Sequence, residues 1–196
     1  WEMPDAFRQM EDALAGGATN RLAFSVAAEA SRQLGNRDRA VEILRQGLAH
    51  YPDDLGFLNN LVYLLADTPG GIDEAVRRLP ELLPHAENRI DILDTMTTVL
   101  IRAGRMEEAE RIANQVLALT DTGSVVWFRA NLHLAETMAA HDDWPAAIAM
   151  MTAAMEQATE VDDETVVEAN RKLGQWRRRE ADRTQPTRTP PPAILP

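Results

Sequence analysis

The repeating unit of this chain is clearest in Leu34-Gly-Asn-Arg-Asp-Arg-Ala40-Val-Glu-Ile-Leu44-Arg-Gln-Gly47-Leu-Ala-His-Tyr-Pro52. The stretch opens with a polar turn in which Gly and Asn interrupt regular structure. Ala40 then starts a helical pattern, because Leu44 and Gly47 follow it four and seven places later. The stretch therefore predicts a helix with one face of small and apolar side chains, which a proline ends.

The same order of residues recurs five times along the 196 residues. The five segments are Met3-Pro-Asp-Ala6 with Met10 and Ala13, Arg37-Asp-Arg-Ala40 with Leu44 and Gly47, Ile72-Asp-Glu-Ala75 with Leu79 and Leu82, Met106-Glu-Glu-Ala109 with Ala113 and Val116, and Trp144-Pro-Ala-Ala147 with Met151 and Ala154. Their first alanines are 34, 35, 34 and 38 residues apart. Antiparallel helices approach to about 8–10 Å where small residues line the contact. We therefore expect each alanine near the start of the second helix of a pair.

A second apolar stripe precedes each of the last four alanines. The stripes are Phe24/Ala27/Ala28/Leu34, Leu58/Leu61/Val62/Leu65, Leu93/Met96/Val99/Leu100 and Asn131/Leu134/Ala135/Met138. All keep helical spacing, and an aromatic content of only 5% disfavours a sheet. The sequence predicts an all-α fold of antiparallel helix pairs.

The stretch 34–52 resembles the second half of a tetratricopeptide repeat (TPR). The resemblance is carried by the turn residue Gly35, the close-packing Ala40, Leu44, the small Gly47 and the terminal Pro52. Residues 94–109 are a second match, and Asn59–Asp67 is similar to the first helix of many bacterial repeats; the likeness covers residues 3–160. It implies an α-solenoid, a right-handed superhelix of helix pairs in which the first helix of each pair lines a concave groove.

We expect residues 1–182 to form one such solenoid. Its predicted parts are 1–17 (second helix of a preceding repeat), four repeats at 18–52, 53–87, 88–121 and 122–160, and a capping helix at 161–182. Residues 183–196 are predicted to be a Pro-rich tail or linker. Because the pattern starts in mid-repeat, we expect the chain to be part of a longer protein and to lack the natural N-terminus.

Two departures from the repeat pattern carry structural expectations. Pro80 and Pro84 fall within a predicted second helix, and an interior proline costs about 3 kcal/mol, so that helix should kink or end early. The turn before the last alanine has Asp142 where the family prefers glycine, and the loop Thr120–Ser124 brings four extra residues.

Charge and composition exclude several functions. The net charge is −11, and residues 171–196 contribute +5 while the other 170 residues carry −16. Such an acidic body repels phosphate backbones, so we expect no nucleic-acid partner. No run approaches the roughly 20 apolar residues of a membrane helix. The absence of cysteine leaves the compartment open between bacterial cytoplasm and periplasm.

The chain carries no set of residues typical of catalysis. His133 and Glu136 stand one helical turn apart, but no third ligand lies at a known metal spacing. Carboxylate pairs such as Asp53-Asp54 precede predicted helices, where they act as caps. We expect no cofactor, no metal and no enzymatic activity.

Under the TPR resemblance, positions one turn from the buried stripes face the groove. These are Ser25, Glu29, Arg32, Asn59, Asn60, Tyr63, Asp91, Asp94, Thr95, Thr98, Arg129, His133 and Glu136. Asn59 and Asn60 are the strongest candidates, since an amide both donates to and accepts from a peptide backbone. The clamp that some family members use for a C-terminal carboxylate is matched only at Asn60. The mixed, acid-leaning groove favours a neutral or basic extended segment, and the basic tail 183–196 is a candidate for self-docking.

Three functions remain open at this point. The first is a non-catalytic protein-interaction scaffold that binds a polypeptide segment, as part of a larger bacterial assembly or export protein. The second is a regulatory or substrate-recruiting segment of a multidomain enzyme of the kinase or glycosyltransferase type. The third is a homotypic assembly piece.

Overall fold

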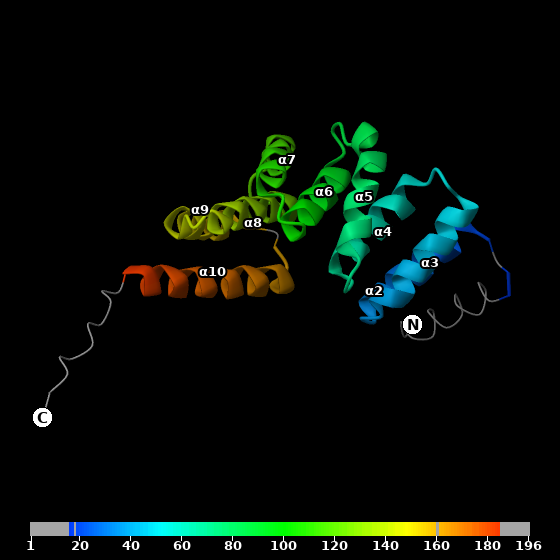
Figure 1. Cartoon of the computed structure of the whole chain (residues 1–196), viewed down its shortest axis with the longest axis horizontal. Coiled ribbons are helices and arrows are strands. Elements are labelled where there is room, and N and C mark those ends of the chain that lie inside the picture. The colour runs from blue at the N-terminus through cyan, green and yellow to red at the C-terminus, as the bar shows by residue number, and fades with distance from the viewer. Residues whose placement is uncertain (1–15, 18, 160, 185–196) are drawn as a thin grey trace, which may run out of the picture. The chain divides into compact units, whose positions relative to one another are not determined.

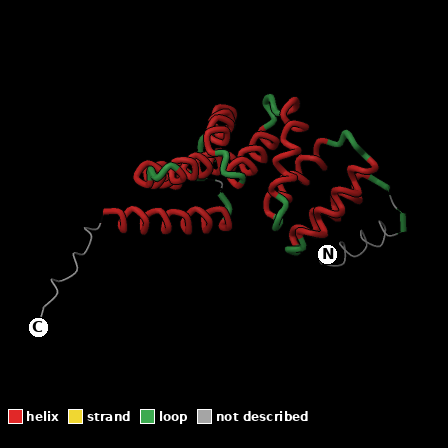
Figure 2. The backbone as a smooth tube through the Cα atoms, viewed as in Figure 1, coloured by secondary structure: helices red, strands yellow, loops and turns green. Residues whose placement is uncertain are grey.

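The computed structural model describes residues 16–184 except 18 and 160, and every regular element in this part of the chain is a helix (Figure 2). The chain divides into two compact units, Trp1–Thr120 and Asp121–Pro196. The first unit contains α2 (Arg21–Gln33), α3 (Arg37–His50), α4 (Leu55–Asp67), α5 (Ile72–Leu82), the 3-10 helix η1 (Leu83–His85), α6 (Ile90–Arg102) and α7 (Met106–Leu119). The second contains α8 (Val125–Ala140), α9 (Trp144–Gln157) and α10 (Asp163–Thr184).

Consecutive helices pack as pairs within each unit (Figure 1). In the first unit α2 packs on α3, α4 on α5 and α6 on α7, and the pairs are joined because α4 contacts α3 and α6. In the second unit α8 pairs with α9, and α10 packs against both. No described helix combines the length and the apolar character that a membrane span requires.

The repeated alanines lie at the seams of these pairs. Ala40, Ala75, Ala109 and Ala147 are each the fourth residue of a second helix, and each is completely buried. A methyl group is small enough to admit the facing helix, which confirms the expectation for these four positions. Ala6 and the predicted helix at 1–17 fall largely outside the described residues, as does most of the tail 183–196.

Three of the turns inside the pairs share one hydrogen-bond pattern. After α2, α6 and α8, the amide of the third residue beyond the helix donates to a carbonyl five residues earlier: Asn36 to Ser31 at 2.9 Å, Arg105 to Leu100 at 2.9 Å and Asp143 to Met138 at 3.0 Å. The motif needs a left-handed residue in between. Gly35 (φ 77°) and Gly104 (φ 73°) supply it in two turns, and Asp142 (φ 61°) supplies it in the third.

The prolines shorten α5, so of the two expected effects, a kink or an early end, the structure shows the early end. The other second helices, α3, α7 and α9, have 14 residues each, whereas α5 has 11 and gives way to η1. Proline lacks the N–H that the helical ladder needs. Pro80 weakens the last turn of α5, and Pro84 is tolerated in the first turn of η1.

The second unit has its own apolar core. Its buried members are Phe128, Leu132, Ala135 and Ala139 of α8, Trp144, Ala147, Met151 and Ala154 of α9, and Ala169, Leu173 and Trp176 of α10. Arg179 of α10 lies over the Trp144 ring, 5.2 Å from its centre. The apolar side of α10 therefore covers the α8–α9 pair, as a solenoid cap must.

Candidate functional site

A small pocket lies where two first helices of the first unit come together. Its volume is about 180 Å³, and it is lined by Ala28, Glu29 and Arg32 of α2, Leu44 of α3, and Asn60, Tyr63 and Leu64 of α4. Four of the thirteen predicted groove residues thus surround one pocket. They converge because α2 and α4 turn their other sides, which include Ala27 and Leu61, into the core.

The pocket carries a charge pair that neutralises itself. Arg32 donates to Glu29 from Nε at 2.8 Å and from Nη2 at 2.7 Å, and Gln33 Nε2 donates to Glu29 at 2.6 Å. The bonds from Arg32, above all, hold the pKa of Glu29 below its usual range despite partial burial. The two charges at the pocket therefore offset each other, and no single sign dominates it.

Asn60 and Tyr63 are the accessible groups of α4. Both are exposed, and Tyr63 keeps 36% of its surface. Asn59, which was predicted together with Asn60, is only partly accessible. Its Oδ1 is buried and accepts no hydrogen bond from any described residue. Ser25 is likewise partly buried and does not line the pocket. The spacing of residues in the sequence did not show that Asn60 is exposed while the neighbouring Asn59 is partly buried.

The prediction of an open groove fails at α6. Asp94, Thr95 and Thr98 are buried, with 7%, 4% and 7% of their surfaces exposed. Every residue from Ile92 to Leu100 is buried, because α6 packs against α4, α5 and α7. The α6 helix therefore lacks the solvent-exposed face that the groove prediction requires. Asp91, at the start of α6, is exposed, and Arg89 binds its carboxylate at 2.9 and 2.7 Å, which lowers its pKa.

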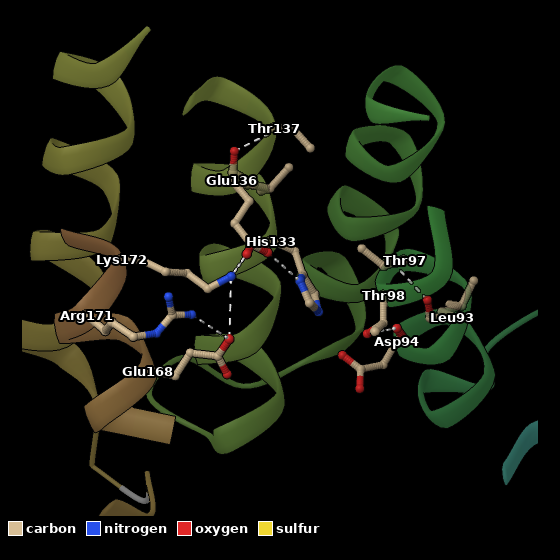
Figure 3. A network of polar contacts seen from close by, with 11 residues as sticks. Leu93, Asp94, Thr97, Thr98, His133, Glu136, Thr137, Glu168, Arg171 and Lys172 are labelled. Atoms are coloured by element: carbon tan, nitrogen blue, oxygen red, sulfur yellow. Dashed lines mark hydrogen bonds and ion pairs between the residues drawn. The ribbon is translucent and has the colours of Figure 1, made fainter. Parts of the chain in front are cut away.

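The predicted residues of α8 also differ from solvated groove side chains. Arg129, His133 and Glu136 are all partly buried. His133 Nδ1 lies 3.2 Å from Glu136 Oε2, and Lys172 of α10 forms an ion pair with the other oxygen of Glu136 (Figure 3). Lys172 also lies 3.4 Å from Glu168 on its own helix. The polar face of α8 is thus engaged by α10, which helical spacing within α8 could not reveal.

Among the residues that the structure describes, no group of three His, Cys, Asp or Glu side chains is close enough to hold a metal ion.

Comparison with known proteins places the fold. No family model and no curated protein matches this sequence. Among solved structures, a tetratricopeptide repeat protein from Parabacteroides merdae superposes with a TM-score of 0.73 and 14% identity, over 95% of this chain and 74% of that one. A thermophilic TPR protein from Thermus thermophilus matches at 0.64 and 21% identity, over 89% and 90% of the two chains. The fold is of the TPR type.

A further TPR-like neighbour is PilW, described as a widely conserved type IV pilus biogenesis factor. It matches with a TM-score of 0.68 and 20% identity, over 89% of this chain and 78% of its own. At such identities the likeness concerns the fold. In TPR terms α2, α4, α6 and α8 are first helices and α3, α5, α7 and α9 are second helices.

Proposed function

We propose that this chain is a non-catalytic protein-interaction scaffold whose α2–α4 face binds a polypeptide segment. The main support is the convergence of Glu29, Arg32, Asn60 and Tyr63 on one pocket, on the helices that line the groove of a TPR array. TPR-type folds typically serve as interaction modules, and the acidic charge of −11 disfavours nucleic acid.

The side chains of the α2–α4 face indicate which conformation and charge the bound segment should have. The Asn60 amide can donate to and accept from a peptide backbone, which is most accessible in an extended segment. The Tyr63 ring offers apolar contact with a polar end. Because Glu29 and Arg32 offset each other, the pocket itself favours a neutral segment, and the surrounding acidic protein adds attraction for a basic one.

The wider role that we propose is within a larger bacterial assembly or export protein. PilW, a structural neighbour, is a pilus biogenesis factor, and repeat scaffolds suit such systems because their extended surfaces bind polypeptides.

The test is selection of peptides from an unbiased extended-peptide library, followed by affinity measurement on variants. Asn60→Ala and Tyr63→Ala should each weaken the selected peptide about tenfold or more. Asn114→Ala is the matched control, since Asn114 is an exposed asparagine on α7, outside the pocket. Peptide binding that ignores both α4 substitutions would remove the α2–α4 face as the site.

A further inference from the structure

The interior of the α2–α4 pocket differs from its mouth. Three apolar side chains form the interior, namely Ala28 of α2, Leu44 of α3 and Leu64 of α4, and they are 4%, 1% and 4% exposed. The four polar residues that line the pocket are all exposed and therefore surround its mouth. A ligand group that enters between them leaves water and meets apolar side chains.

The volume of the pocket sets the size of the group that fits. At about 180 Å³ it is smaller than the sites that hold whole small molecules, which span roughly 300–1,000 Å³. An engineered apolar cavity of about 150 Å³ in another protein holds one benzene ring. Ala28 contributes only a methyl group to the lining, which leaves this space open. The pocket therefore matches one side chain of phenyl size.

The charges at the mouth do not select a charged side chain. Glu29 accepts hydrogen bonds from Arg32 and from Gln33, so a ligand cation would compete with Arg32 and a ligand anion with Glu29. A charge that reached the interior would find no hydrogen-bonding side chain among the three apolar residues, and burying it there would be costly. The pocket therefore favours an uncharged, apolar side chain.

Tyr63 favours an aromatic group over an aliphatic one. It lines the pocket and is 36% exposed, so its ring is available to a ligand. Two aromatic rings in contact attract each other beyond the effect of the area that they bury. Phenylalanine supplies such a ring without a polar atom. The hydroxyl of a tyrosine would need a hydrogen-bond partner in the apolar interior, and the indole of a tryptophan is larger than a benzene ring.

We propose that the α2–α4 pocket binds the side chain of one phenylalanine of the bound polypeptide. This inference rests on the proposed function, since it specifies which residue the peptide-binding face selects. The ring occupies the space above Ala28, Leu44 and Leu64, and the backbone beside it pairs with the exposed Asn60 amide. A segment without an apolar residue at this position leaves the pocket in contact with water and binds more weakly.

The experiment uses the intact chain and a series of labelled extended peptides that differ at one central position. That position holds phenylalanine, leucine, tyrosine, tryptophan, alanine, aspartate or lysine between neutral polar residues, and each Kd is measured by fluorescence anisotropy. The phenylalanine peptide should bind about tenfold or more tightly than the alanine, aspartate and lysine peptides. It should also bind more tightly than the leucine, tyrosine and tryptophan peptides.

Two substitutions change the size of the pocket. Leu64→Val enlarges it and should bring the Kd of the tryptophan peptide several-fold closer to that of the phenylalanine peptide. Ala28→Val reduces it and should shift the preference to the leucine peptide; Leu64→Val alone decides if circular dichroism shows that Ala28→Val does not fold. Leu65→Val is the matched control, because Leu65 is a leucine of α4 that is only 2% exposed and does not line the pocket. It should leave the order of the peptides unchanged.

The phenylalanine anchor is overturned if the phenylalanine peptide is not the tightest, or if Leu65→Val shifts the preference as much as Leu64→Val. Where Asn60→Ala and Tyr63→Ala still weaken the peptides in that case, the peptide-binding face itself stands. Peptides that do not bind saturably, or whose binding ignores both α4 substitutions, would overturn the anchor and the proposed function together.

Discussion

Arg21, the first residue of α2, is paired with Asp54, the residue that caps the N-terminus of α4. Its Nη2 donates to Asp54 Oδ1 at 3.1 Å and its Nε donates to Oδ2, and the same carboxylate accepts the Phe57 amide at 3.0 Å. The guanidinium also lies 5.3 Å from the centre of the Phe57 ring. One carboxylate therefore joins the two helices of the proposed peptide-binding face, 33 residues apart.

Removing this carboxylate should destabilise the first unit. Asp54→Ala loses the cap and the ion pair, and we expect a cost of about 1–2 kcal/mol. Asp54→Asn keeps a good capping residue and loses only the charge, so its cost should be smaller. Hydrogen exchange of the α4 amides reports the loss. Asp53→Ala is the control, because Asp53 is the exposed residue directly before Asp54. An equal loss of protection in this variant would contradict the role of Asp54.

Acid should destabilise the same region. The hydrogen bond from Arg21 lowers the pKa of Asp54, and arginine partners lower the pKa values of Glu29, Asp91 and Glu108. A carboxyl whose folded pKa is depressed stabilises the fold above its unfolded pKa of about 4, and this contribution is lost as the pH falls through the folded pKa. Urea unfolding should therefore show decreasing stability from about pH 4–5 downward, with a shallower slope in Asp54→Asn. An unchanged slope would show that Asp54 titrates normally.

Enlarging a seam alanine should separate its helix pair. Ala40 is completely buried between α3 and its partner, and Ala40→Leu forces extra methyl groups into that contact at about 1–3 kcal/mol. Ala49→Leu makes the same change at an exposed position of α3 and should be nearly neutral. Urea unfolding followed by circular dichroism compares the two. Equal stability would place the seam elsewhere.

Asp142→Gly should stabilise the second unit. Asp142 holds a left-handed φ of 61° in a turn whose counterparts are Gly35 and Gly104, and a side chain in that conformation costs about 1 kcal/mol. We expect a gain of up to about 1 kcal/mol, measured by thermal unfolding. Asp142→Val, a β-branched residue, should be destabilising; a stable valine variant would mean that the turn tolerates another conformation.

Breaking the contact between α8 and α10 should loosen the capping helix. The side chains of Glu136 and Lys172 are only 15% and 17% exposed, so Lys172→Met leaves a partly buried carboxylate without its cation. We expect a loss of about 1–3 kcal/mol, below the range for fully buried pairs. Trp144 and Trp176 lie in this unit's core, and their fluorescence follows its unfolding. The double variant with Glu136→Gln should recover part of the loss; no recovery would show that Lys172 acts through other contacts.

Local chemistry was sufficient to predict the helices of the described chain. Ala40, Ala75, Ala109 and Ala147 indicated the seams, because only a small side chain fits where helices touch. The early end of α5 followed from the missing N–H of Pro80. One apolar position was misplaced: Leu34 caps the end of α2 and stays 48% exposed, since a residue past the last helical turn no longer follows the helical face.

Which polar residues remain accessible was beyond the reach of helical periodicity. Spacing gives the side of a helix on which a residue lies, but it does not say which other helices arrive there. Asp94, Thr95 and Thr98 are covered because α6 is packed by several neighbours, and Glu136 is bound by a lysine that is 36 residues further along the chain. Exposure and ion pairing depend on contacts between distant segments, so they emerge only when the helices are packed together.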